Sequence, residues 1–359
     1  MRRVARTHLA VVCLLAACND PAIAPPDGRL ADVVDAETDA IETDVHAQDN
    51  GPYSGLEIQP VAIWGRGRGL DGEGHGLDDF SYPSGIALSS DESEIYVYDV
   101  GNRRIKALSR EGETLRTWPH PEPSCGSNSE PIAVALDGTI LIVDSGAHEL
   151  VRYSPSGEEV GRWRIAGAPA FCSSSPQHSH PLVVGPNGDV YLAEVLLGQI
   201  QQYTIDGNLV RTFGEPGEDK GQFALGPLGL AIANGVLYAP DVIVRFSPSK
   251  ERFLLFDLFG SFLGYLPPVP DDPYFYFATA MMGVNGWLAA IRDDSPPMIF
   301  LKPPTSEVFV YRWSAASRNP GPRNLGSAFA LAIASDGLWY ITDHSNHCIR
   351  VMRPSVPLE

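Results

Sequence analysis

The sequence has few basic residues and no long hydrophobic run. Lysine and arginine total 26 against 44 acidic residues, so the 359-residue chain has a formal net charge of −18 and a pI near 4.8. This charge argues against nucleic acid and against an anionic lipid surface as partners. No segment reaches the roughly 18 consecutive apolar residues that a transmembrane helix needs.

Cysteine is also scarce, with five in the chain. The cysteines do not fall in a Cys/His/Asn arrangement, and the chain has no G-x-S-x-G segment. Those are the patterns that accompany an activated nucleophile. The sequence therefore gives no sign of nucleophilic catalysis.

The first 18 residues have the features of a secretion signal. Three arginines in the first six residues precede a short apolar run, Leu9 to Ala17, which is too short to span a bilayer. Residues 15–18 read Leu-Ala-Ala-Cys and resemble the lipobox of bacterial lipoproteins, which implies that Cys18 is lipidated. The alternative is an ordinary signal peptide with an incidental cysteine. Asn19 is not the aspartate associated with inner-membrane retention, so the expected location is the cell envelope, at the outer membrane.

Residues 19–54 have the composition of a tether. Nine acidic residues stand against a single arginine, Arg29, and alanine and proline are frequent. Such a segment buries too little apolar surface to offset the entropy of ordering. We expect a disordered acidic tether over 19–54 and one folded domain over 55–354.

The rest of the chain repeats a unit of short predicted strands. In the first unit, from Phe80 to Trp118, apolar or alternating runs too short for helices end at turn residues, which is typical of consecutive antiparallel strands. The second strand of each unit closes on an acid, and these acids recur at intervals of 45 to 52 residues: Asp99, Asp144, Glu194, Asp241, Asp293 and Asp343. Four strands in about 40–50 residues make a propeller blade. We therefore predict an all-β, six-bladed β-propeller of four-stranded antiparallel blades.

The sixth unit lacks a fourth strand, because the chain reaches its third strand at Ile349–Met352 and then stops at Pro354. An unassigned strand, Ile58–Trp64, ends on an aromatic residue as the other fourth strands do. We predict that it completes the last blade and closes the ring, which removes the open sheet edges.

Three segments resemble NHL repeats, and one of them reads Gly214-x-Pro216-Gly217 through Gly221-Gln222-Phe223, then Pro227-x-Gly229-Leu230-Ala231. The first unit reads Phe80-x-x-Pro83-x-Gly85-Ile86-Ala87, followed by Tyr96-Val97-Tyr98-Asp99-x-x-Asn102-x-Arg104-Ile105. The last unit, Asp343-x-x-Asn346-x-Cys348-Ile349, has Cys in place of the Arg. The resemblance implies a propeller, but such propellers include both binding modules and metal-assisted enzymes with His or acidic ligands at the channel mouth.

Two cysteines precede the first strands of the second and third units. Equivalent loops of neighbouring blades lie side by side, so Cys125 and Cys172 are predicted to form a disulfide, which an exported location permits. Cys348, at a strand start, is predicted to be a lone thiol in the blade wall.

Two further loops raise alternatives. Residues 67–72 fit G-x-G-x-x-G but lack the strand-turn-helix setting of a dinucleotide site. Asp71 and its acidic neighbours could hold Ca²⁺, although their spacing matches no known loop. The Pro-rich, aromatic segment 267–277 either packs between blades or grips a peptide or glycan.

The register maps the unusual loops to one face, where strand four leads to the next strand one and strand two leads to strand three. The candidate binding residues on this face are Asp71, His75, Asp99, Asn102, Arg104, Asp144, His148, His178, His180, Glu194, Asp241, Asp293, Asp343, His344 and Asn346. His148, His178, His180 and His344 are the candidate ligands of a transition metal.

Two functions remain open from the sequence. The first is a monomeric, lipid-anchored binding or scaffold propeller for a protein, peptide or glycan, with no cofactor. The alternative is a metal-dependent hydrolase or lyase with its site at the mouth of the channel.

Overall fold

The computed structural model describes residues 57–65, 74–121, 130–167, 180–243, 250–266, 278–292, 297–314 and 325–355. The predicted signal, the tether and the segment 267–277 lie outside these residues, as do Cys18, Asp71, Cys125, Cys172, His178 and Asp293. None of the described helical segments could cross a membrane.

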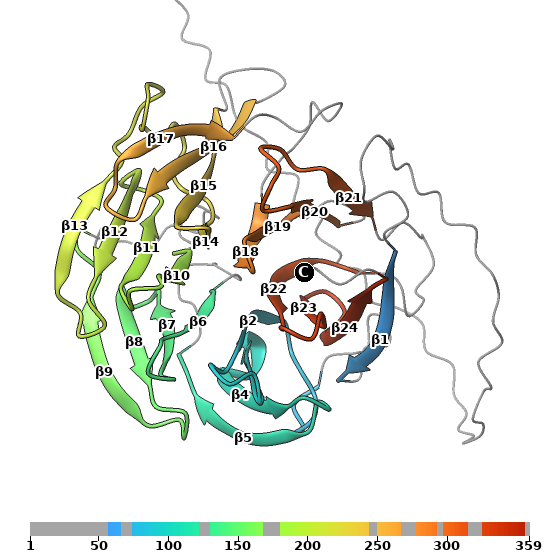
Figure 1. Ribbon diagram of the computed structural model, residues 1–359. Helices are drawn as coiled ribbons and strands as arrows, with labels where there is room; N and C mark the ends of the chain where they lie inside the picture. Colours follow the sequence, from blue (N-terminus) through green and yellow to red (C-terminus); the bar gives the residue numbers. More distant parts are fainter. Residues whose placement is uncertain are drawn as a thin grey trace, which may run out of the picture. The chain divides into compact units, whose positions relative to one another are not determined.

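The described residues form six four-stranded antiparallel sheets arranged as a propeller, which confirms the predicted fold class (Figure 1). Blade one contains β2 (Pro83–Leu88), β3 (Glu94–Asp99), β4 (Arg104–Ser109) and β5 (Thr114–Pro119). Blade two contains β6 (Ile132–Val134), β7 (Ile140–Asp144), β8 (Glu149–Tyr153) and β9 (Glu159–Arg164). Blade three contains β10 (Leu182–Val184), β11 (Val190–Glu194), β12 (Gln199–Tyr203) and β13 (Leu209–Phe213).

The second half of the ring repeats this order. Blade four contains β14 (Ala231–Ala233), β15 (Val236–Ile243), β16 (Lys250–Asp257) and β17 (Phe262–Leu266). Blade five contains β18 (Ala278–Val284), β19 (Trp287–Arg292), β20 (Met298–Lys302) and β21 (Tyr311–Ser314). Blade six contains β22 (Ala328–Ile333), β23 (Trp339–Asp343), β24 (Cys348–Pro354) and β1 (Ile58–Trp64).

The ring closes as predicted, because β1 pairs antiparallel with β24 from Ile58 opposite Pro354 to Trp64 opposite Ile349. The pairing continues beyond the strands, where the Ser355 N–H donates to the Glu57 carbonyl at 2.7 Å. The N-terminal strand therefore covers the outer edge of the last blade.

In blades four and five, an Asn-Gly pair forms the turn between the first and second strands. Asn234 and Asn285 have positive φ angles, 51° and 48°, and the glycines that follow them do too. Two consecutive residues with positive φ make a type I′ hairpin turn, which matches the right-handed twist of the strands. The Asx-Gly pairs thus set the register of these hairpins.

Neighbouring blades are joined by a recurring contact between an aromatic ring and a glycine. The aromatic residue of strand four packs on the glycine of the next blade's turn between strands three and four. The pairs are Trp64 with Gly112, Trp118 with Gly157, Trp163 with Gly207 and Phe213 with Gly260. All four glycines have φ between +85° and +89°. A side chain at these positions would strike the ring.

Substitution of Gly157 with Ala tests this contact. Gly157 has φ +89°, and an added Cβ would lie 2.7 Å from the Trp118 ring. We expect Gly157→Ala to lower the free energy of unfolding by about 2–4 kcal/mol, since overpacking adds to backbone strain. Gly337→Ala is the matched control, because its φ is +82° and nothing lies within 4 Å. Chemical denaturation should show a loss of about 1 kcal/mol for the control. Equal losses would exclude a role for the ring contact.

Candidate functional site

Three of the six blade acids tie the fold together. Asp99, at the end of β3, is buried and accepts hydrogen bonds from the Ser81 N–H at 2.7 Å and from Arg104 Nε and Asn102 Nδ2, both at 2.8 Å. Asp241 in β15 accepts the backbone N–H groups of residues 224–226 and Arg252 Nε. These acids hold the loop that enters their own blade.

Asp343 in blade six keeps this role although the repeat's arginine is missing. Cys348 lies opposite Asp343 across the strand pair, at the position that Arg104 holds opposite Asp99. Arg350 lies two residues further along β24, on the same face, and its Nε donates to Asp343 at 2.9 Å. Asn346 Nδ2 and the Gly326 N–H also donate hydrogen bonds to the Asp343 carboxylate. Burial raises the pKa of the Cys348 thiol to about 12, so this cysteine is a neutral wall residue.

Blades two and three differ from this pattern. Asp144 Oδ2 accepts a hydrogen bond at 3.1 Å from Nη1 of Arg162, which lies on strand four of the same blade. Glu194 has a histidine partner, since His180 Nε2 lies 3.1 Å from its Oε2. Blade two therefore takes its arginine from another strand, and blade three uses a histidine where blades one, four and six use an arginine.

Strand pairing identifies equivalent positions at the channel mouth in four blades. In each of these blades, the residue two before the blade acid pairs with a residue of strand one. The equivalent position lies two residues before that strand-one partner. These positions are Ser84, Glu130, His180 and Phe329. Ser84, Glu130 and Phe329 line the axial channel, and His180 directly precedes Pro181, which also lines it. Two ionisable side chains thus occupy neighbouring blades at one mouth.

Glu130 is a buried carboxylic acid with an exposed fraction of 2%. Burial raises its pKa to about 8, because the neighbouring Ser145 only partly offsets the loss of solvent. His120 Nε2 lies 3.9 Å from Oε2, but burial lowers the pKa of His120 to about 4, so that ring is neutral. Glu130 therefore keeps its proton at neutral pH and can donate it.

His180 has the opposite role. The Glu194 carboxylate can only accept a hydrogen bond, so the His180 Nε2 carries the proton and the lone pair is on Nδ1. Nδ1 is buried, and none of the described residues offers it a hydrogen-bond partner. The His148 ring packs edge-on beside it, with centroids 6.2 Å apart. His180 is a base whose tautomer is fixed by a carboxylate.

The other predicted histidines lie elsewhere on the face. In blade six, His344 Nδ1 contacts the Pro83 carbonyl at 3.3 Å, and its ring packs on Phe329 with centroids 4.2 Å apart. Burial lowers the pKa of His344 to about 4. His75, near blade one, contacts the Asn102 amide oxygen at 2.6 Å.

The four predicted metal ligands are therefore not gathered by the described residues. His148 and His180 are neighbours, His344 belongs to blade six, and His178 lies outside the described residues. In the described part of the chain, no three His, Cys, Asp or Glu side chains come close enough to hold a metal ion. The described donors of this set therefore do not form a metal centre.

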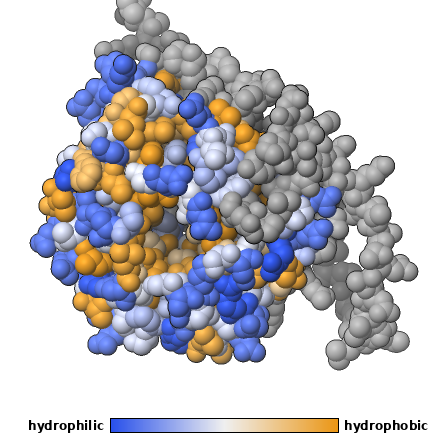
Figure 2. Space-filling view, in the orientation of Figure 1, coloured by the Kyte–Doolittle hydropathy of each residue, from blue (hydrophilic) through white to orange (hydrophobic). Residues whose placement is uncertain are grey.

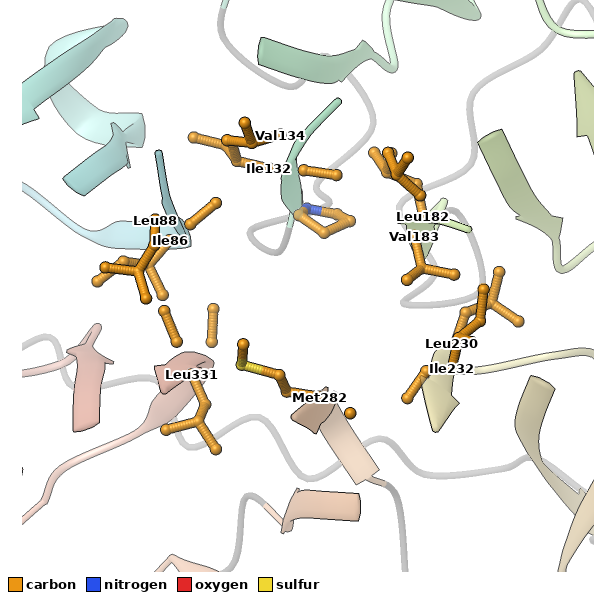
Figure 3. A pocket seen from close by; sticks show the side chains of 18 of the residues that line it. Ile86, Leu88, Ile132, Val134, Leu182, Val183, Leu230, Ile232, Met282 and Leu331 are labelled. Carbon is orange, nitrogen blue, oxygen red and sulfur yellow. The ribbon is translucent and has the colours of Figure 1, made fainter. Parts of the chain in front are cut away.

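The mouth opens into an axial channel of about 630 Å³, lined by the first strands of all six blades. Figure 2 shows the hollow at the centre of the ring. Most side chains along it are apolar, as Figure 3 shows for Leu88, Val134, Val183, Ile232, Met282 and Leu331. A channel of this volume is within the range of small-molecule sites, about 300–1,000 Å³.

Comparison with known proteins gives relatives by structure alone. No protein-family model and no curated protein sequence matches the chain. A gluconolactonase from Xanthomonas campestris superposes with a TM-score of 0.52 and 14% identity, over 84% of this chain and 95% of that one. A streptogramin B lyase gives 0.50 and 14%, over 84% and 97%. A catalytically inactive virginiamycin B lyase from Staphylococcus aureus, with quinupristin, gives 0.50 and 15%, over 85% and 89%.

At identities this low, the structural similarity shows the fold alone. The resemblance to NHL repeats stays a prediction. The chain is a six-bladed β-propeller of the fold that these lyases and this gluconolactonase share.

Proposed function

We propose that the protein is an enzyme that cleaves the ester bond of a neutral carboxylic ester or lactone by acid–base catalysis at the channel mouth. The observation that carries this proposal is that a buried carboxyl with a raised pKa, Glu130, and a histidine held by a carboxylate, His180, occupy equivalent positions of neighbouring blades. A buried carboxyl whose pKa is raised by burial is typical of acid–base sites. The structural neighbours support the reaction class, since they include a gluconolactonase and lyases.

The reaction assigns one role to each group. His180 Nδ1 removes a proton from water as the water oxygen bonds to the carbonyl carbon of the ester. The bond from that carbon to the leaving oxygen then breaks, and Glu130 donates its proton to that oxygen. Solvent carries the proton from His180 back to the Glu130 carboxylate, so both side chains return to their starting states. Glu194 keeps the His180 ring in the required tautomer and stabilises the imidazolium.

Turnover of p-nitrophenyl acetate and δ-valerolactone by the mature protein tests the proposal. We expect His180→Gln to lower kcat/KM by about 10²–10⁴-fold, the usual contribution of a positioned acid or base. His75→Gln is the matched control, because His75 lies on the same face and is exposed. Thermal melts of both variants should show that the fold is intact.

Reaction in H₂¹⁸O identifies the chemistry, because hydrolysis places the label in the carboxylate and elimination leaves an unlabelled carboxylate. Label in the acid product supports a hydrolase, whereas an alkene product reassigns the same acid and base to a lyase. Absence of turnover on both substrates, with His180→Gln unchanged from the parent, would contradict catalysis. The predicted binding or scaffold role for a protein, peptide or glycan would then be the better description.

A further inference from the structure

The axial channel contains the strongest indication of what the substrate is. Its lining includes residues from the first strands of all six blades, and most are Leu, Ile, Val, Ala, Gly or Pro. Among the described residues that line it, the ionisable side chains are Glu130 at the mouth and Glu92 at the opposite end. The Glu92 carboxylate is engaged by the Ser335 N–H and hydroxyl, at 2.9 and 2.7 Å. The interior between the two ends therefore offers no ionic partner to a ligand.

The channel is long enough for an extended chain. In blade two the lining runs from Glu130 to Leu136, and six steps of an extended strand span roughly 20 Å. An extended hydrocarbon chain can lie along this length against the mostly apolar wall.

The wall can adapt to such a chain. Met282 of β18 is partly exposed to the channel, and its Sδ accepts the backbone N–H of Ile333 from the next blade at 3.1 Å. The thioether thereby covers a polar edge of strand one with a flexible apolar side chain. Val183 and Ile232 contribute partly exposed aliphatic surface from blades three and four.

We infer that the substrate is a neutral ester with an unbranched acyl chain, and that this chain lies in the axial channel while the carbonyl lies beside Glu130 and His180. The inference rests on the proposed function, since it names the substrate of that same acid–base site. Burial of the chain in the channel supplies apolar binding energy, and the uncharged wall disfavours ionic substrates.

A series of p-nitrophenyl esters of increasing acyl length, from acetate through butyrate to octanoate, tests the inference with the mature protein. Each buried methylene stabilises the complex by about 0.8 kcal/mol, which corresponds to about a fourfold rise in kcat/KM per methylene. We expect this rise up to the length that fills the channel, followed by a plateau.

Val183→Phe narrows the channel and should remove the chain-length dependence. Its expected effect is a loss of at least tenfold in the ratio of kcat/KM on octanoate to kcat/KM on acetate. Val160→Phe is the matched control, since Val160 is 49% exposed on strand four of blade two. It should leave the whole series unchanged. Calorimetric binding of decan-1-ol to the unmodified protein, lost in Val183→Phe, gives a readout that does not need catalysis.

The outcomes separate the two proposals. Hydrolysis of acetate with a flat chain-length series and no decan-1-ol binding overturns the acyl-chain inference and leaves the proposed function standing. Binding of decan-1-ol that Val183→Phe abolishes, with no hydrolysis of any ester, supports the channel as an apolar-chain site and overturns the proposed function.

Discussion

Replacing Glu130 with Gln is expected to raise the free energy of unfolding at pH 8 and to remove most of its pH dependence below that value. Burial raises the pKa of this carboxyl from 4.5 to about 8. Between these values the unfolded chain has lost the proton and the folded chain keeps it, so the parent protein loses stability as pH rises. Glutamine has no proton to lose, so the variant avoids this loss.

The effect is large because one pKa unit corresponds to about 1.4 kcal/mol, and burial raises the pKa of Glu130 from 4.5 to about 8. We expect a gain of several kcal/mol at pH 8, measured by urea unfolding at pH 5 and pH 8. Glu113→Gln is the matched control, because Glu113 is exposed on the turn before β5. Parallel pH profiles for Glu130→Gln and the parent protein would show that the carboxyl ionises normally.

The same substitution should abolish proton donation. We expect the activity of the parent protein to fall as pH rises through about 8, where Glu130 deprotonates. Glu130→Gln should be inactive at every pH while being the more stable protein. Gain of stability with loss of activity is what a strained catalytic group produces when it is replaced, whereas loss of a structural contact would lower both.

The fold could be predicted from the sequence because each blade contains local signals. Asn234 and Asn285 specify their turns through positive φ. In four blades strand two ends at its acid, whereas β15 continues two residues beyond Asp241. The closing strand Ile58–Trp64 could be found because the last unit lacked a partner for β24. These signals depend on neighbouring residues or on simple counting along the repeat.

The site was harder to predict because it depends on how loops of different blades meet. His180 was among the candidates, whereas Glu130 was not, since it follows no strand and belongs to no motif. Its burial arises from blade packing, and a Cβ on Gly85 of blade one would lie 2.4 Å from the Glu130 carbonyl oxygen. Aligning the residues before Pro131 and Pro181 would have placed Glu130 and His180 at equivalent positions.

The predicted metal ligands show that placing residues on one face of the propeller does not place them close to one another. His148 and His344 both occupy loops between strands two and three, as the register indicated. They belong to blades two and six, however, and a propeller face holds six such loops around one axis. Sharing a face therefore does not bring side chains within reach of one ion, about 2.0–2.1 Å for a histidine nitrogen on zinc.

Deleting residues 1–65 is expected to destroy the cooperative folding of the propeller, whereas deleting residues 1–54 should leave its thermal stability nearly unchanged. The longer deletion removes β1, which forms the outer strand of blade six. Ile58 belongs to the buried core between blades five and six, and Trp64 packs against the core between blades six and one. The deletion therefore opens both interfaces and exposes the edge of β24, which favours aggregation.

A point substitution separates loss of packing from loss of the strand. The Trp64 ring lies 5.4 Å from that of Tyr340 and packs on Gly112 of blade one. Trp64→Ala keeps the backbone pairing but removes this ring, so we expect a loss of about 3–5 kcal/mol in the free energy of unfolding. Val61→Ala is the control on the same strand, because Val61 is 55% exposed and should cost less than about 1 kcal/mol. Melting curves that coincide for the two deletions would show that the ring does not need β1. Closure by both pairing and packing is supported if the deletion of residues 1–65 is the most damaging change, Trp64→Ala is intermediate and Val61→Ala is the least damaging.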